Sequence, residues 1–152
     1  MPTLQETYNT CLFHSTTALS RTLTRMAEEQ FGPLGLTPTM GFILITARAA
    51  PGILISDLAL VHQLDVSTIS RALDKLVAAQ FALREGAHKN IRVFVTPKGE
   101  RKEAEAQAAW NKLQQAYTLI LSEPEARKLA GEVTAALIPL RTATTRSKDQ
   151  RS

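Results

Sequence analysis

Residues 55–99 constrain the fold of this chain more than any other segment, because two short helical patterns, a hairpin pattern and a helix start follow one another there without a linker. About three residues separate the two helical patterns, which is the spacing of a helix-turn-helix. We expect Ser56 and Ser67 to cap these helices. In the second helix the apolar residues recur at the three-and-four spacing of one buried face: Ile69, Ala72, Leu73, Leu76 and Val77.

The opposite face of this second helix is polar, and small hydroxyl side chains precede Arg and Lys along it. Hydroxyl and guanidinium groups reach phosphates and base edges when the N-terminal end of a helix enters the DNA major groove. An ordinary solvated helix face is the alternative interpretation. The residues predicted to face DNA are Ser67, Thr68, Ser70, Arg71 and Lys75.

A basic hairpin pattern follows, in which residues 81–85 and 91–95 read as strands around a polar tip, residues 86–90. Such a hairpin after a helix-turn-helix is typical of a wing, whose tip reaches phosphates or the minor groove. A solvated hairpin is the alternative. Thr96-Pro97 then starts another helix, and Gly99 permits a close backbone approach. The wing residues predicted to contact DNA are His88, Lys89, Asn90 and Arg92.

The net charge of the chain is concentrated in the same region. Residues 66–99 contain six basic residues (Lys or Arg) and two acidic residues (one Asp and one Glu). This segment therefore carries a charge of +4, which equals the net charge of the whole chain. The remaining residues hold equal numbers of acidic and basic side chains. A surface that follows a phosphate backbone has this electrostatic pattern.

Long amphipathic helices are predicted on both sides, over residues 4–31 and 100–144. Helices of this length must bury their apolar stripes, so we expect them to form a dimer interface. A buried helix after Thr37-Pro38 opens the lobe of residues 37–99. Pro139 should kink or end the last helix, and we expect residues 141–152 to fray. The predicted fold class is mainly α with a small β-hairpin: a winged helix-turn-helix, flanked by long N- and C-terminal dimerisation helices, in one chain of residues 1–152.

Composition excludes several classes of protein. No run of about eighteen apolar residues occurs, so we expect a soluble, cytoplasmic protein with no membrane partner. One cysteine cannot form an internal disulfide framework. The three histidines, His14, His62 and His88, lie on separate predicted elements, and no glycine-rich phosphate loop is present. Nothing resembles a catalytic set, so we expect no enzyme activity, no metal site and no cofactor.

Five short motifs follow one another along the chain: Leu36-Thr37, Asp57-Leu58-Ala59, Val66-Ser67-Thr68-Ile69-Ser70-Arg71, Leu73-Asp74-Lys75-Leu76 and Val95-Thr96-Pro97-Lys98-Gly99. In this order and at this spacing they resemble the MarR family of bacterial winged helix-turn-helix transcription regulators, over nearly the whole chain. The resemblance implies a triangular homodimer that acts as a repressor on double-stranded, pseudo-palindromic operator DNA. Each recognition helix would enter a major groove, with half-sites about one helical turn apart.

The wing tip departs from the family pattern. Members commonly carry Asp-x-Arg at the tip, and alignment back from Thr96 puts Ala87 and Lys89 at these positions. Lysine cannot make the planar, bidentate contacts of arginine. We therefore expect this wing to contribute less to sequence specificity than to affinity.

The resemblance also implies two regulatory features. Many members bind small aromatic or phenolic acids between the dimer helices and the winged lobe, where His14, Arg21 and Arg25 could supply cationic groups. Some members sense peroxides through a lone cysteine in the first helix, the region of Cys11, although its place on the apolar stripe favours an inert packed thiol. Two alternative functions stay open: a peroxide-responsive regulator that acts through Cys11, and a winged-helix protein-interaction module without operator binding.

Overall fold

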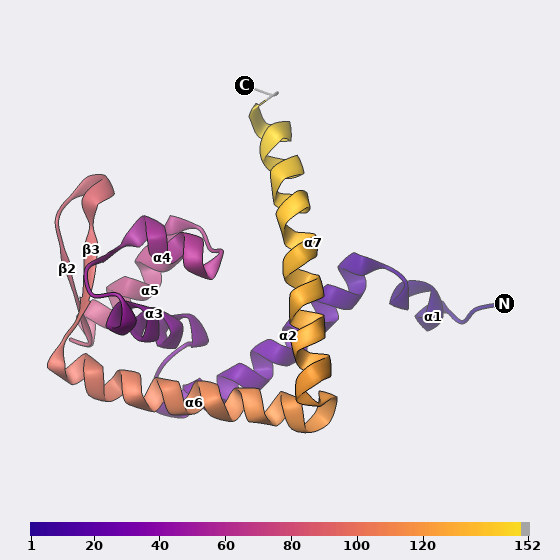
Figure 1. The fold of residues 1–152 in the computed structure, drawn as a ribbon, viewed down its shortest axis with the longest axis horizontal. Coiled ribbons are helices and arrows are strands. Elements are labelled where there is room, and N and C mark those ends of the chain that lie inside the picture. Colours follow the sequence, from indigo (N-terminus) through magenta and orange to yellow (C-terminus); the bar gives the residue numbers. More distant parts are fainter. Residues whose placement is uncertain (150–152) are drawn as a thin grey trace. The chain divides into compact units, whose positions relative to one another are not determined.

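The chain is mainly helical with one small antiparallel sheet, so the predicted fold class is confirmed (Figure 1). This computed structural model describes residues 1–149, and the side chains of residues 1–145. In chain order the elements are α1 (Leu4–Asn9), α2 (Leu12–Phe31), the 3-10 turn η1 (Gly32–Leu34), α3 (Pro38–Ala49), β1 (Ile53–Leu54), α4 (Ile55–His62), α5 (Val66–Ala78), β2 (Ala82–Glu85), the 3-10 turn η2 (His88–Asn90), β3 (Arg92–Val95), α6 (Pro97–Leu121) and α7 (Glu123–Asp149).

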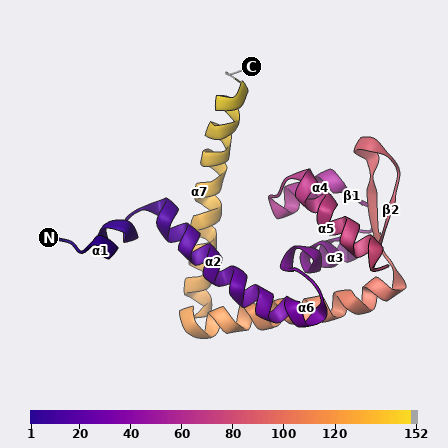
Figure 2. The ribbon, with the colours of Figure 1, turned by 180° about the vertical axis from the view of Figure 1, so that it is seen from behind.

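The helix-turn-helix and the wing form one lobe within the compact unit Met1–Leu113. Helices α3, α4 and α5 lie together beside the sheet, and β2 and β3 form a long two-stranded hairpin (Figures 1 and 2). The strand order is β1-β3-β2, with both pairs antiparallel. In the hairpin Ala82 pairs with Val95 and Glu85 pairs with Arg92, so the predicted wing strands are confirmed to within one residue.

The core of this lobe uses the apolar faces that the sequence predicts. On α5, Ile69, Ala72, Leu73 and Leu76 are buried, and Val77 packs partly buried against the same core. The three-and-four periodicity therefore identified the inward face correctly. The largest fully buried side chains come from α2, α3, α4, α5 and β3, and they are Phe31, Ile43, Leu44, Leu58, Ile69, Leu73, Leu76 and Val93.

Both predicted serine caps are wrong. Helix α4 begins at Ile55, one residue before Ser56, because the Ile55 amide donates to the carbonyl of Ile91 at 3.0 Å and the strand leads directly into the helix. Helix α5 begins at Val66 with Asp65 as its N-cap residue, so Ser67 lies inside the first turn. The side chain of Asp65 makes no capping hydrogen bond. Ser67 is therefore available to face outward.

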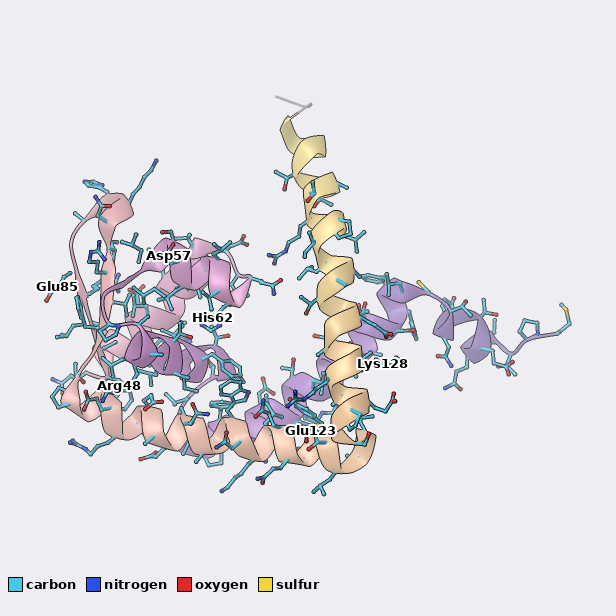
Figure 3. The ribbon with its side chains drawn as sticks, in the orientation of Figure 1. Arg48, Asp57, His62, Glu85, Glu123 and Lys128 are labelled. Atoms are coloured by element: carbon cyan, nitrogen blue, oxygen red, sulfur yellow. The ribbon has the colours of Figure 1, made fainter. Side chains whose placement is uncertain are left out.

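Hydrogen bonds connect the start of α6 to the turn that follows α5. Thr96 Oγ1 donates to the carbonyl of Gln80 at 2.6 Å and accepts from the Gly99 amide at 2.9 Å. A Cβ atom on Gly99 would overlap the carbonyl oxygen of Phe81, so the close approach predicted for this glycine is confirmed. An exposed ion pair between Arg48 and Glu100, 3.6 Å apart, adds a contact from α3 (Figure 3).

The N-terminal segment forms two helices, where the sequence predicts one over residues 4–31. Helix α1 ends at Asn9 and α2 begins at Leu12. Thr10 Oγ1 donates to the Thr7 carbonyl at 2.8 Å, and Ser15 Oγ donates to the Asn9 carbonyl at 3.1 Å. Such local bonds from short polar side chains compete with helical hydrogen bonds and explain the interruption.

The second compact unit, from Gln114 onward, consists of the end of α6 and helix α7. Helix α7 continues through Pro139 to Asp149, so of the two predicted effects of this proline, a kink or an end of the helix, the end is wrong. The expectation that the tail frays from residue 141 is wrong as far as residue 149. Residues 150–152 lie outside the described residues. No described side chain of α7 is buried within the chain. Across residues 1–149, no helix combines the length and hydropathy needed to cross a membrane.

Candidate nucleic-acid interface

The outward face of α5 carries all five residues predicted there. Ser67, Arg71 and Lys75 follow one another at intervals of four residues, so they form one row along the helix surface, and all three are exposed. Thr68 and Ser70 are half-buried at the edges of this row. Burial of the opposite face fixes the orientation of the helix, and the hydroxyl and cationic groups therefore point away from the core.

Two cations on this face have no partner among the side chains and backbone groups that the structure describes. In the part of the chain that the structure describes, neither Arg71 nor Lys75 makes a side-chain hydrogen bond or an ion pair. A free guanidinium and a free ammonium one turn apart can bind phosphate oxygens, and the guanidinium can also bind a guanine edge in two places. The face has the chemistry of a DNA-reading surface.

An ion pair between Asp74 and Arg84 joins α5 to strand β2. No sequence pattern indicates this contact, because it forms only when the hairpin folds back beside the helix. Both side chains are partly exposed, so the pair contributes little to stability. Because Arg84 is paired with Asp74, its guanidinium is not free to bind an external anion such as a phosphate.

The tip of the wing is held by its backbone. Gly86 has a φ of +95°, and a Cβ atom there would overlap the carbonyl oxygen of Asn90. The Asn90 amide donates to the Ala87 carbonyl at 3.1 Å, which closes the turn. His88, with a φ of +55°, is exposed together with Lys89 and Asn90. The three predicted tip residues thus lie together on a closed, exposed turn.

The other cations near the wing are engaged by the chain itself. Arg92 donates from Nη1 to the carbonyl of Gly52 at 2.9 Å, which fixes the turn before β1 to β3. Lys98 donates to the carbonyl of Ala79 at 3.1 Å and lies 5.2 Å from the centroid of the Phe81 ring. Of the six cations in residues 66–99, the three without such a partner among residues 1–149 are Arg71, Lys75 and Lys89.

His62 connects α4 to α3 and does not lie on the outward face of α5. Its Nε2 lies 3.0 Å from Thr46 Oγ1, and its ring stacks against Phe42 with the centroids 6.3 Å apart (Figure 3). Trp110 of α6 contacts the same Phe42 ring edge-on at 5.6 Å. Partial burial lowers the pKa of His62 from its ordinary value, so the neutral ring is favoured.

The predicted regulatory residues are exposed along α2 and just before it. The His14 ring lies 5.5 Å from the ring of Tyr8, and Arg21 Nε donates to the Thr17 carbonyl at 3.3 Å. Cys11 is exposed in the single chain and lies in the interruption before α2, so the predicted packing of its thiol would need the dimer partner. Within residues 1–149, no three His, Cys, Asp or Glu side chains are arranged to hold a metal ion.

These elements define a winged helix-turn-helix fold, in which α4 and α5 are the helix-turn-helix and β2 and β3 are the wing. The fold is that of the MarR-family transcription regulators, and the expected resemblance is confirmed by comparison with solved structures.

A mutant MarR from E. coli complexed with operator DNA superposes with a TM-score of 0.73 at 24% identity, over 86% of this chain and 97% of that one. The transcriptional regulator SlyA gives a TM-score of 0.70 at 23% identity, over 86% of this chain and 94% of that chain. A putative MarR-family regulator from Listeria monocytogenes, complexed with a 26mer DNA, gives 0.70 at 18% identity, over 85% of this chain and 88% of that one. No protein-family model matches the sequence, and no curated protein matches it.

Proposed function

We propose that this chain is a cytoplasmic transcription regulator that binds double-stranded DNA as a homodimer, on a pseudo-palindromic operator, and acts as a repressor. The observation that carries the proposal is the outward face of α5, where Arg71 and Lys75 are exposed and lack a partner among the described residues. Lys89 extends the free positive charge to the wing tip. Solved structures of the same fold, one with operator DNA and one with a 26mer DNA, support this assignment.

Exposed apolar side chains on the terminal helices support the homodimer. Leu12 and Phe13 at the start of α2, and Val133 and Leu140 on α7, are exposed in the single chain. On α7, Val133 and Leu140 are seven residues apart and so share one face of the helix, and exposed apolar side chains gathered on one face mark an interaction site. A second copy of the chain covers such surfaces symmetrically, and a two-fold dimer matches the symmetry of a palindromic site.

The proposal is tested by fluorescence anisotropy with the DNA that flanks the protein's own gene, over a series of salt concentrations. Two phosphate contacts per protomer, from Lys75 and Lys89, predict a slope of log K against log salt of about −4 for a dimer. Arg71→Ala should weaken binding by about 1–3 kcal/mol and relax the preference at one base position in each half-site. Arg101→Ala, on α6, is the matched control, because it removes the same exposed cation away from α5 and the wing, and it should bind nearly as the unsubstituted protein does. Absence of salt-dependent binding would favour a protein-interaction module.

A small aromatic or phenolic acid is the proposed effector that relieves repression. His14, Arg21 and Arg25 are separated by seven and four residues, so they lie on one face of α2 and present cationic or hydrogen-bonding groups in one line. A hydroxybenzoate should release labelled operator from the protein, and Arg25→Ala should need a higher concentration of it. Release at the same concentration from both proteins would remove these residues from the effector site.

Regulation by peroxide is the second candidate, and the exposure of Cys11 supports it because an oxidant can reach the thiol. Operator affinity should then fall after hydroperoxide treatment of the unsubstituted protein and stay constant for Cys11→Ser. Equal affinity before and after treatment would exclude the sensor.

A further inference from the structure

Val66 is an apolar side chain placed where the proposed recognition helix begins. It is the first residue of α5, directly after the N-cap residue Asp65. Its side chain is 48% exposed, although the residues that follow it on the outward face are polar or charged. Helix propensity does not explain a valine there, because β-branched residues are poorer helix formers than alanine.

Val66 lies at the N-terminal end of α5, at the edge of the face that carries the proposed DNA-reading residues. Val66 and Ser70 are four residues apart, so they lie one above the other on the helix. Ser67, the next residue, begins the row that continues through Arg71 and Lys75. Residues at the N-terminal end of a recognition helix are the ones that reach base edges.

The major groove offers one apolar feature to such a side chain, the C5-methyl group of thymine. A valine cannot donate or accept a hydrogen bond, so it cannot read the other base edges and would leave their polar groups without partners. We infer that Val66 is a specificity-determining residue that packs against a thymine methyl group in each operator half-site. This inference rests on the proposed function, since it requires α5 to enter the major groove.

Other exposed apolar residues lie nearby but outside the recognition helix. Leu60 and Val61 are on α4, and Leu64 is in the turn. Val61 is 57% exposed, slightly more than Val66, and it carries the same side chain. It is therefore a matched control for exposure and for the chemical change from valine to alanine.

The experiment begins by selecting the operator from a random duplex library with the full-length protein. Each thymine of one half-site is then replaced by uracil, which removes only the methyl group, and binding is measured by fluorescence anisotropy. One thymine should show a rise in Kd of about fourfold on this replacement, equivalent to burial of one methyl group at about 0.8 kcal/mol. Val66→Ala should abolish this rise, whereas Val61→Ala should retain it.

Two results overturn the inference. The first is a uracil effect that is equal in the unsubstituted protein and in Val66→Ala at every position. The second is a uracil effect that is lost equally in Val61→Ala, which would show a general change of the lobe. Failure to select any sequence would instead overturn the proposed function, and with it the inference. Circular dichroism checks that both variants keep the helical content of the unsubstituted protein.

Discussion

Helices α5 and α7 are both amphipathic, but they obtain their packing in different ways. Helix α5 buries four apolar residues against its own chain, whereas α7 buries none of its described side chains. Helix α7 is also twice as long, with 27 residues against 13. Tertiary packing supplies most helix stability in proteins, so α5 is complete within one chain, whereas α7 would obtain its packing from the proposed dimer partner. Side chains packed within the chain stabilise the fold, and the exposed apolar side chains of α7 are candidates for a partner surface.

The largest effect should come from the inward face of α5. Leu73 is fully buried, so Leu73→Ala removes packed methyl groups and leaves a cavity, at a cost of about 2–5 kcal/mol in the free energy of unfolding. Urea denaturation at a fixed protein concentration measures this loss. Leu83→Ala on β2, where the side chain is 51% exposed, is the control and should change stability by less than about 0.5 kcal/mol. Equal losses in the two variants would contradict the assignment of the core.

The next effect should appear on α7 as a change of assembly. Val133 is 46% exposed and lies on the apolar stripe, so Val133→Arg would place a charge in the proposed dimer interface. We expect the dissociation constant of the dimer to rise more than about tenfold, because an uncompensated buried charge costs several kcal/mol. Sedimentation velocity over a range of protein concentrations measures it.

Thr134→Arg is the control for this substitution, because Thr134 is exposed, follows Val133 in the sequence and points away from the apolar stripe. Identical sedimentation of the two variants would show that this stripe does not form the interface.

A smaller effect should separate two cations of the wing, one free and one engaged. Lys89→Ala should lower DNA affinity severalfold and reduce the salt slope by about one per protomer, because a phosphate contact is lost. Its sequence preference should stay the same. Arg92→Ala should instead lower the free energy of unfolding by about 1 kcal/mol, through loss of the bond to the Gly52 carbonyl. A changed sequence preference in Lys89→Ala would mean that this wing reads bases after all.

The smallest effect should come from His62. Burial lowers the pKa of His62 in the folded chain below its value in the unfolded chain. At a pH between these two pKa values, the unfolded chain therefore binds more protons than the folded chain. Stability should therefore decrease as the pH falls through about 6.5. The slope should be well below the one-proton limit of about 1.4 kcal/mol per pH unit, since the ring is only partly buried. His62→Gln should flatten the profile of unfolding free energy against pH, and an unchanged profile would exclude His62 as the source.

The sequence predicts the lobe well where the signal is local. The buried face of α5 follows from residue spacing, and the wing strands follow from two short apolar runs around a polar tip. The interruption at Thr10-Cys11 was missed because Leu4, Tyr8 and Leu12 keep helical spacing across it. The helix is interrupted by local hydrogen bonds from hydroxyl side chains. The spacing of apolar residues does not report such bonds.

The division of the cations into free and engaged could not be predicted from the sequence. Arg92 meets Gly52 across 40 residues, and Arg84 meets Asp74 only when the wing folds beside α5. Counting charges over residues 66–99 gives the correct sign of the surface but treats all six cations as equal. The fold decides which of them remain available, since it determines which carbonyl and carboxylate oxygens come within reach.

The glycine at the base of the wing tip has a consequence for how this protein can change over evolutionary time. Because Gly86 and the backbone of Asn90 shape the turn, the side chains of Lys89 and Asn90 are not needed to form it. Mutations at these two positions can therefore alter the side chains that the wing tip exposes without endangering the hairpin. The tip can drift while Gly86 is retained, and a departure from the family pattern at Ala87 and Lys89 is the kind of variation that such a tip tolerates.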